Sequence, residues 1–317
     1  MSQNIKLGIS TCLLGEKVRY DGGHKLDRYL TRTLGQFVTF VPVCPEVECG
    51  MPVPREALHL VGDPQSPRLV TIRSNEDRTD QMKEWAGQRL RELEAEDLCG
   101  FIFKSKSPSS GMERVKVYSG KGGSPQHTGV GIWARAFMDH FPSLPVEEDG
   151  RLHDPGLREN FIERVFVMKR WRDRARGDRS KGDLVEFHTR HKLLLMAHSP
   201  KAYKELGKFV SDLSDVNPEQ IEQEYFTRLA AALKLKATVK KNHNVLLHIL
   251  GYFKKELTRD EKQEVLGLFD AYARGDVPLI VPVTLLNHFV RKYDQPYLKN
   301  QYYLSPHPLE LRLRNHV

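Results

Sequence analysis

Short apolar runs alternate with amphipathic segments in the first half of the chain. The runs at residues 5–11, 38–43 and 99–104 are rich in β-branched or aromatic side chains, as is typical of buried strands. Residues 26–36 and 76–97 lie between these runs and place apolar side chains at helical spacing. Strands that alternate with helices predict an α/β domain of three layers with a mostly parallel sheet. The same pattern predicts two further elements, a short edge strand at 115–119 and a closing helix at 128–140.

The pattern changes in the second half, where apolar side chains recur at i, i+3, i+4 and i+7 with almost no strand signal. Three prolines, two glycines and an acidic run make residues 141–156 a predicted linker. Helix starts are marked as well, since Pro200 and Pro218 each follow a capping residue. We therefore predict an α/β domain over residues 1–145 and an all-α domain of six or seven helices over residues 156–317.

The composition is that of a globular protein and excludes a membrane-embedded one. The chain has 317 residues, of which 39% are hydrophobic and 28% are charged. No apolar run approaches the roughly 20 residues that cross a bilayer, and the N-terminal residues lack the pattern of a signal peptide. We expect a cytoplasmic protein that contacts no membrane.

The formal net charge of +8 is unevenly distributed along the chain. Residues 1–150 carry 19 Lys and Arg against 20 Asp and Glu, whereas residues 151–317 carry 30 against 21. A basic half of this kind is typical of a domain that binds an anion, with nucleic acid as the leading candidate. A basic surface that is merely solvated explains the charge equally well.

Basic and aromatic side chains are interleaved in the second half, most densely in the sequence KRWRDRAR at residues 169–176. Cations in such a stretch neutralise phosphates, and its tryptophan can stack on an exposed base. We predict RNA binding by four of these residues, namely Lys169, Arg170, Arg172 and Arg174. The alternative is that the stretch forms the solvated face of an amphipathic helix.

Three polar loops follow the three predicted strands of the first domain, at residues 11–23, 44–55 and 104–114. In an open parallel sheet, the loops at the carboxyl ends of the strands share one edge and surround a common crevice. Side chains that are far apart in the sequence are therefore expected to converge there.

Three of the four cysteines can reach that crevice, because Cys12 ends the first strand and Cys44 and Cys49 lie in the second loop. Cys99 begins its strand, so at about 3.3 Å per residue it lies roughly 15 Å away, which indicates a small buried hydrophobe. The spacing matches a structural zinc site poorly and suits a [4Fe–4S] cluster on three thiolates. A thiol nucleophile and a purely structural role stay open.

The loops also carry a family resemblance. The motifs CLLGEKVRYDG at residues 12–22, VCPEVECGMPVPR at 43–55 and KSKSPSSG at 104–111 resemble those of the thiouracil desulfidase family. The second half resembles the helical companion domain of bacterial two-domain desulfidases that act on 4-thiouridine in tRNA. The resemblance implies an enzyme that binds tRNA and uses a [4Fe–4S] cluster on three cysteines. Its reaction would remove sulfur from a thiolated pyrimidine, giving uridine and sulfide.

Within this resemblance, Cys12 and Cys44 match two of the cluster ligands. Single-domain relatives usually carry cysteine where this chain has Ser110, and glycine where it has Cys49. We therefore predict Cys12, Cys44 and Cys49 as the ligands of the cluster, with Cys49 replacing the missing thiolate. The alternatives are that Ser110 is a weak ligand or that the cluster has only two protein thiolates.

Glu46 and Ser107 match positions that resemble the family's acid–base groups. The chemistry needs such groups, since water must add at C4 of the pyrimidine while the carbon–sulfur bond breaks. We predict that Glu46 moves protons and that Ser107 orients the water or the pyrimidine. The structural alternatives are a turn residue before Pro108 for Ser107 and a supporting carboxylate for Glu46.

Two other functions compete with tRNA desulfidation. One is desulfidation of free thiolated pyrimidines, and the other is a nucleic-acid-binding regulator whose cluster acts only as a sensor. A pure sensor would more readily close all four cluster positions with cysteine, so the open position and the acid–base pair favour an enzyme. The sequence implies no protein partner.

Overall fold

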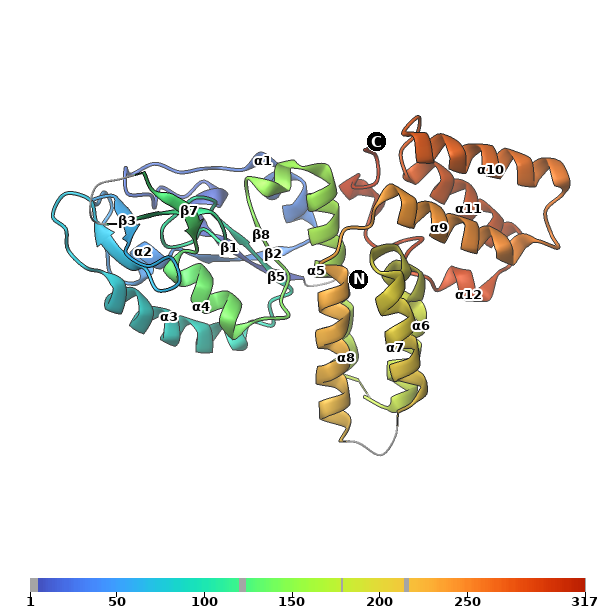
Figure 1. Ribbon diagram of the computed structural model, residues 1–317, viewed down its shortest axis with the longest axis horizontal. Helices are drawn as coiled ribbons and strands as arrows, with labels where there is room; N and C mark the ends of the chain where they lie inside the picture. The colour runs from blue at the N-terminus through green and yellow to red at the C-terminus, as the bar shows by residue number, and fades with distance from the viewer. Residues whose placement is uncertain (1–4, 120–123, 178, 214–216, 317) are drawn as a thin grey trace. The chain divides into compact units, whose positions relative to one another are not determined.

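The computed structural model describes residues 5–119, 124–177, 179–213 and 217–316. The chain divides into two compact units, Met1–His153 and Asp154–Val317, which are described separately below. The first unit is α/β and the second is helical, so the predicted fold class is confirmed (Figure 1).

The first unit is built on a four-stranded sheet in which all neighbours are parallel, with the order β2-β1-β5-β8. Its strands are β1 (Lys6–Ser10), β2 (Thr39–Val43), β5 (Gly100–Phe103) and β8 (Val146–Glu148). Ser10 lies opposite Val43, and Phe103 lies opposite Glu148. The carboxyl ends of the four strands therefore meet at one edge, which is where the predicted site residues follow.

Helices cover the parallel sheet, as the predicted three-layer arrangement requires (Figure 1). They are α1 (Arg28–Arg32), α2 (Pro45–Glu48), α3 (Thr79–Glu94) and α4 (Ile132–His140). Phe101 and Phe103 of β5 pack against Phe137 of α4, with ring centroids 4.6 and 5.6 Å apart. Trp133 of α4 is fully buried and lies against Trp85 of α3. This aromatic cluster fixes α3 and α4 to the sheet.

A second sheet, with the order β4-β3-β6-β7, contains strands that the sequence pattern largely failed to predict. Its strands are β3 (Leu58–Val61), β4 (Arg68–Thr71), β6 (Val115–Tyr118) and β7 (Gln126–Gly129). The edge strand predicted at 115–119 exists, but it lies inside this second sheet between β3 and β7. These four-residue strands are only partly buried, so they lack the continuous apolar runs that identify the parallel strands.

The prediction of a linker at 141–156 is wrong for its central residues, which form β8. Glu147 and Glu148 are buried there because both carboxylates have partners. Glu147 accepts a hydrogen bond from Arg151 at 2.6 Å, and Glu148 accepts one from the backbone N–H of Met112 at 2.8 Å. A reading of the sequence from hydrophobic periodicity places charged residues at the surface, so it does not predict a strand that buries two carboxylates.

The second unit contains helices and no β-strand among the residues that the structure describes, as predicted, and these residues form eight α-helices instead of the predicted six or seven. Its helices are α5 (Pro155–Ala175), α6 (Lys181–His198), α7 (Pro200–Ser211), α8 (Pro218–Leu233), α9 (Val239–Leu250), α10 (Arg259–Arg274), α11 (Ile280–Lys292) and α12 (Pro296–Lys299). The predicted helix starts at Pro200 and Pro218 are confirmed, because the preceding residues cap both helices. The Ser199 side chain accepts a hydrogen bond from the N–H of Ala202, and that of Asn217 accepts one from the N–H of Glu219. No helix in the described ranges is both long and apolar enough to span a membrane.

The stretch predicted to bind RNA lies on α5, and much of it faces the interior of the helical unit. Lys169 is buried and pairs with Asp173, while Arg174 contacts Asp183 at 2.9 Å and Glu222 at 3.0 Å. Arg170 donates to the carbonyl of Pro306 and lies 3.8 Å from the ring centroid of Tyr302. Arg172 is half-buried. Internal contacts therefore account for the positive charges of Lys169, Arg170 and Arg174. RNA binding by the four residues stays a prediction.

Trp171 of the same stretch belongs to an aromatic cluster inside the helical unit. Its ring stacks on Phe226 at 4.8 Å and on Tyr225 at 5.7 Å, and it meets the edge of Phe187 at 5.2 Å. The interleaved aromatic side chain is therefore a packing residue here, and base stacking by Trp171 would break these contacts.

A buried ionic network ties the C-terminal segment to α5 and α6. Glu163 accepts a hydrogen bond from Arg314 at 2.8 Å and lies 3.1 Å from Nε2 of His198. Arg314 also donates to Glu159 at 3.2 Å and to the carbonyl of Tyr303 at 2.6 Å. Burial by itself would raise the pKa of Glu163, but the hydrogen bond from His198 and the charge of Arg314 lower the pKa to about 2.

We expect Glu163→Gln to lower the free energy of unfolding of the full chain by about 3–5 kcal/mol, because it leaves the buried Arg314 with one carboxylate partner fewer. The control is Glu224→Gln, which removes an exposed pair with Arg228 and should cost no more than about 1 kcal/mol. Urea unfolding followed by circular dichroism measures both. The depressed pKa adds a pH signature: the stabilisation from Glu163 is full above pH 4.5 and is lost as the pH falls toward 2. Equal losses in the two variants would contradict a stabilising network.

Candidate active site

The three predicted loops surround one cavity at the carboxyl edge of the parallel sheet. The cavity has a volume of about 410 Å³ and receives residues from all three loops, which confirms that they converge. Its lining includes two thiols, several hydroxyls, one carboxylate and five cations, among them Cys12, Cys44, Ser107, Ser109, Ser110, Glu46, Arg19, Lys25, Arg55, Lys104 and Lys106.

Hydrogen bonds between the loops and the strand ends hold this edge together. The N–H of Lys104, just after β5, donates to the hydroxyl of Ser10 at 2.9 Å. The N–H of Lys25 donates to the carbonyl of Cys12 at 2.8 Å, so the first loop folds back over the end of β1. Asp149, which follows β8, accepts from the Lys104 ammonium at 2.9 Å and from the Ser105 N–H at 2.7 Å. Asp149 lies in the segment predicted to be a linker, so the sequence analysis did not identify these contacts.

Cys12 and Cys44 present their thiols to the same cavity. Cys12 is 8% exposed at the end of β1, and Cys44 directly follows β2. Burial raises the pKa of the Cys12 thiol to about 11, although the charges of Lys104 and Arg19 act in the opposite direction. Burial also raises the pKa of Cys44, and the Arg55 charge opposes it. Buried thiols of this kind are inert as free nucleophiles and become thiolates when a metal replaces the proton.

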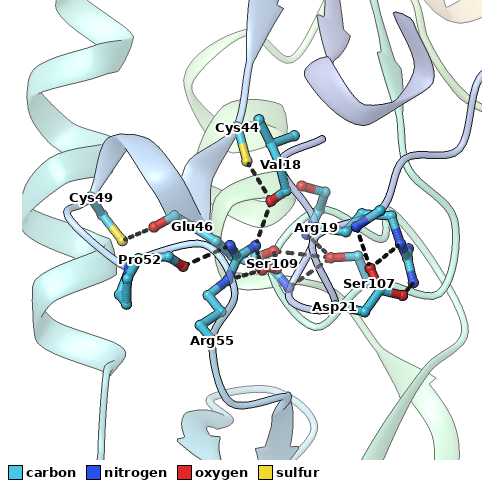
Figure 2. Close-up of polar contacts among 12 residues, drawn as sticks. Val18, Arg19, Asp21, Cys44, Glu46, Cys49, Pro52, Arg55, Ser107 and Ser109 are labelled. Atoms are coloured by element: carbon cyan, nitrogen blue, oxygen red, sulfur yellow. Dashed lines mark hydrogen bonds and ion pairs between the residues drawn. The ribbon is translucent and has the colours of Figure 1, made fainter. Parts of the chain in front are cut away.

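Cys49 is the predicted ligand that does not line the cavity. Its thiol lies 3.4 Å from the carbonyl oxygen of Glu46, whereas the Cys44 thiol is directed toward the carbonyl of Val18 (Figure 2). Cys44 is still close enough for its charge to raise the pKa of Cys49, after burial and the Glu46 carboxylate as larger causes. Across the described residues, no group of three or more Cys, His, Asp or Glu side chains is arranged to hold a metal ion. Two of the three predicted ligands, Cys12 and Cys44, therefore line one cavity, and Cys49 lies outside its wall.

Ser110, the alternative third ligand, lies on the cavity wall. It is 4% exposed, and its backbone N–H donates to the hydroxyl of Ser107 at 3.1 Å. Cys99 is 1% exposed at the start of β5 and is absent from the cavity wall, as its predicted role as a buried hydrophobe requires.

Glu46 and Ser107 are joined by a residue that sequence reasoning did not single out, Ser109. The Ser109 hydroxyl donates to Oε1 of Glu46 at 2.6 Å and lies 2.9 Å from the hydroxyl of Ser107 (Figure 2). The other carboxylate oxygen of Glu46 accepts from Nε of Arg55 at 2.9 Å and pairs with its second nitrogen. Arg55 also donates to the carbonyl of Val18 at 3.0 Å, so its guanidinium fixes the carboxylate between two loops.

The start of α4 holds the loop that carries Ser107 and Ser109 in place. The N–H of Gly131 donates to the carbonyl of Gly111, and the N–H of Ala134 donates to that of Ser109. A Cβ at Gly131 would lie 2.4 Å from the carbonyl oxygen of Ser109, so only glycine permits this approach. The hydroxyls of Ser107 and Ser109 are therefore placed by rigid backbone. Together with Glu46 they form a continuous hydrogen-bonded path along which a proton can be exchanged with a molecule in the cavity.

Comparisons with known proteins assign both halves of the chain. The family model described as 2-thiouracil desulfurase matches residues 7–149, and that of a family described as a protein of unknown function, DUF1722, matches residues 192–308. The uncharacterized protein YbgA of Escherichia coli (strain K12) is 31% identical over 153 residues, which is 48% of this chain and 90% of that protein. The chain belongs to the YbgA family and carries a 2-thiouracil desulfurase domain.

Every residue that lines the cavity lies within the desulfurase domain. The DUF1722 match falls entirely within the helical unit and begins inside α6. Among solved structures, the chain is similar to one described as the [4Fe-4S]-dependent thiouracil desulfidase TudS. The two are 27% identical, and the match covers 48% of this chain and 95% of that one with a TM-score of 0.39. The assignment of the desulfurase domain rests on the family match over residues 7–149.

Proposed function

We propose that the protein is a desulfidase that replaces the sulfur of a thiolated pyrimidine with oxygen from water. The observation that supports this most is the composition of one cavity in the desulfurase domain, which combines two buried thiols with the linked set Glu46, Ser109 and Ser107. In the reaction, a water oxygen forms a bond to the ring carbon, the carbon–sulfur bond breaks, and sulfur leaves as sulfide. No oxidant or reductant is consumed.

We propose a [4Fe–4S] cluster as the cofactor, held by Cys12 and Cys44 and by Cys49 as the third thiolate. When bound, such a cluster supplies an iron without a protein ligand, which acts as a Lewis acid toward sulfur. The electrostatic proximity of Cys44 to both Cys12 and Cys49 supports this set. The presence of Ser110 on the cavity wall supports the competing set, with a serine oxygen as third ligand.

The chain's own residues have separate tasks in this proposal. Glu46 holds or moves a proton at Oε1, the oxygen that accepts from Ser109. Ser107 orients the attacking water or the pyrimidine, and Ser109 is a positioning residue that connects the two groups. Arg55 keeps the carboxylate of Glu46 in place through its other oxygen. Such positioned groups typically accelerate proton transfer about 10²–10⁴-fold.

We further propose 4-thiouridine in tRNA as the physiological substrate, which places the activity in the cytoplasm. The basic second half supports this, with 30 Lys and Arg against 21 Asp and Glu over residues 151–317. RNA contact by Lys169, Arg170, Arg172 and Arg174 is part of the proposal, although three of these charges already have internal partners. A further basic stretch at residues 234–241 lies near the start of α9, and its Lys236 and Lys240 are exposed, so phosphates can reach them.

The test is turnover by anaerobically purified full-length protein on three substrates: tRNA that contains 4-thiouridine, free 4-thiouridine and free 4-thiouracil. We expect one sulfide released for each 4-thiouridine converted to uridine, with tRNA as the best substrate by kcat/KM. Sulfide assay and mass spectrometry of the nucleosides measure this. Turnover of the free compounds alone would select the free-pyrimidine alternative. No sulfide from any substrate, together with cluster-dependent binding of nucleic acid, would select the sensor and overturn the desulfidase.

A further inference from the structure

A second cavity lies within the helical unit, and the proposed function does not use it. Its volume is about 130 Å³, below the roughly 300–1,000 Å³ of pockets for drug-sized molecules. The lining comes from α5, α6, α9, α10 and the C-terminal segment, so elements that are distant in the sequence enclose the space. All of the lining residues belong to the second unit. A cavity of this size suits a small metabolite.

The polar part of the lining belongs mainly to α5. Glu159, Asn160 and Glu163 are one to four residues apart, and their side chains line the cavity from the same face of the helix. Glu163 is 3% exposed, and the other two side chains are half-buried. Two carboxylates are thus held inside the unit, where a charge is costly unless it is paired.

These two carboxylates share one partner that carries a permanent charge. Arg314 donates to Glu159 at 3.2 Å and to Glu163 at 2.8 Å. The other partners are histidines, His316 for Glu159 and His198 for Glu163, whose charge depends on pH. Among the described residues, each carboxylate oxygen accepts one hydrogen bond, although a carboxylate has about four acceptor sites. The two glutamates can therefore accept a further cationic donor, such as an ammonium group.

Four other residues of the lining are aliphatic. They are Ala237, Val239, Val277 and Leu279, and Leu279 is 6% exposed. Aliphatic surface in a pocket binds hydrocarbon, because contact removes both surfaces from water. The cavity is therefore suited to a molecule that has a hydrocarbon part as well as charged groups.

Lys236 adds a cation to this lining. Its side chain is exposed and forms no ion pair with any residue that the structure describes. A Cβ at Gly156, which also lines the cavity, would lie 4.0 Å from the Lys236 ammonium, so the charge lies near the first turn of α5. The carbonyl of Lys236 accepts a hydrogen bond from Lys241 at 2.9 Å, which fixes the backbone there. An anionic group in the cavity would pair with this ammonium.

We infer that this cavity binds a small aliphatic α-amino acid, with the ammonium group at Glu159 and Glu163, the carboxylate at Lys236 and the side chain against the aliphatic lining. Such a zwitterion supplies both charges that the lining can still pair, and it adds no net charge to the unit. An aliphatic amine would leave Lys236 unpaired, and an aliphatic acid would leave the free acceptor sites of the glutamates unused. The inference is independent of the proposed desulfidation, whose residues lie in the other unit.

The test measures binding of L-valine to the full-length protein by isothermal titration calorimetry, with L-alanine and L-leucine to vary the size of the side chain. Isovalerate is valine without the ammonium group, and isobutylamine is valine without the carboxylate. We expect the best of the three amino acids to be valine or one of its neighbours in size. Valine should bind at least about tenfold tighter than either analogue, because charge-assisted hydrogen bonds are strong contacts. Glycine should bind more weakly than valine, since it has no side chain to bury.

The variants are Lys236→Ala, which removes the partner of the carboxylate, and Ala237→Leu, which fills space beside the aliphatic residues. Lys240→Ala is the matched control, because Lys240 is an exposed lysine at the start of α9 that does not line the cavity. Lys236→Ala should weaken valine binding at least about tenfold, whereas the control should stay within about twofold of the wild type. Ala237→Leu should weaken the binding of valine more than that of glycine. The melting temperature of each variant shows that it is folded.

The possible results decide the inference one way or the other. No binding of alanine, valine or leucine would overturn it, as would equal affinities for valine and isovalerate or valine binding that Lys236→Ala leaves unchanged. Inorganic phosphate is the remaining probe. If phosphate binds through Lys236 and the amino acids do not, the lysine is a phosphate contact and the cavity is not an amino-acid site. Sulfide release is measured separately, so failure of the proposed function leaves this test intact.

Discussion

Alanine at Cys12 or at Cys44 is expected to abolish both the bound iron and sulfide release. The two thiols line one cavity, and each loss leaves the cluster without a thiolate that no neighbouring residue replaces. Anaerobically purified variants should be colourless, with iron and acid-labile sulfide near zero by chemical analysis. Cys99→Ala is the control, because its thiol is buried at the start of β5 and should leave the iron content unchanged. Full cluster content in either cavity variant would refute the proposed ligand set.

The same measurement decides the third ligand. We expect Cys49→Ala to lose the cluster and Ser110→Ala to keep it, which requires the Cys49 thiol to leave the carbonyl of Glu46 when iron is present. The opposite pattern would assign the position to Ser110, which already lies on the cavity wall. Retention of the cluster in both variants would mean that only two protein thiolates are needed.

Glu46→Gln and Ser107→Ala are expected to keep the cluster and to lower kcat about 10²–10⁴-fold, because each removes a positioned group for proton transfer. Neither side chain supplies a thiolate, so the iron content should equal that of the wild type. Ser66→Ala, at an exposed serine outside the cavity, is the control for activity. The melting temperature must accompany the rates for Glu46→Gln, since this change removes the charge partner of the buried Arg55 side chain. Normal turnover in both variants would exclude these residues from the mechanism.

The sequence by itself determined the parts of the fold that have a strong periodic signal. The parallel strands β1, β2 and β5 are short apolar runs, and the helices of the second unit repeat at i, i+3, i+4 and i+7. Convergence of the three loops followed from this, because parallel strands share a carboxyl edge. Of the second sheet only β6 was predicted, whereas β3, β4, β7 and β8 have short or charged sequences that could not be recognised, since tertiary partners make them stable.

For the site, the sequence identified the residue types, and the tertiary structure decided which of them meet. Cys12 and Cys44 share a cavity because Ser10 and Val43 are in register at the ends of neighbouring strands. Cys49 turns toward the carbonyl of Glu46 instead, which a count of residues between cysteines cannot foresee. Likewise, the sequence of α5 shows that the helix is basic, but it does not show which residues its side chains contact. Arg174 pairs with Asp183 and Glu222, which lie on other helices. Spacing fixes how far a side chain can reach, whereas its direction and partners depend on packing between distant segments.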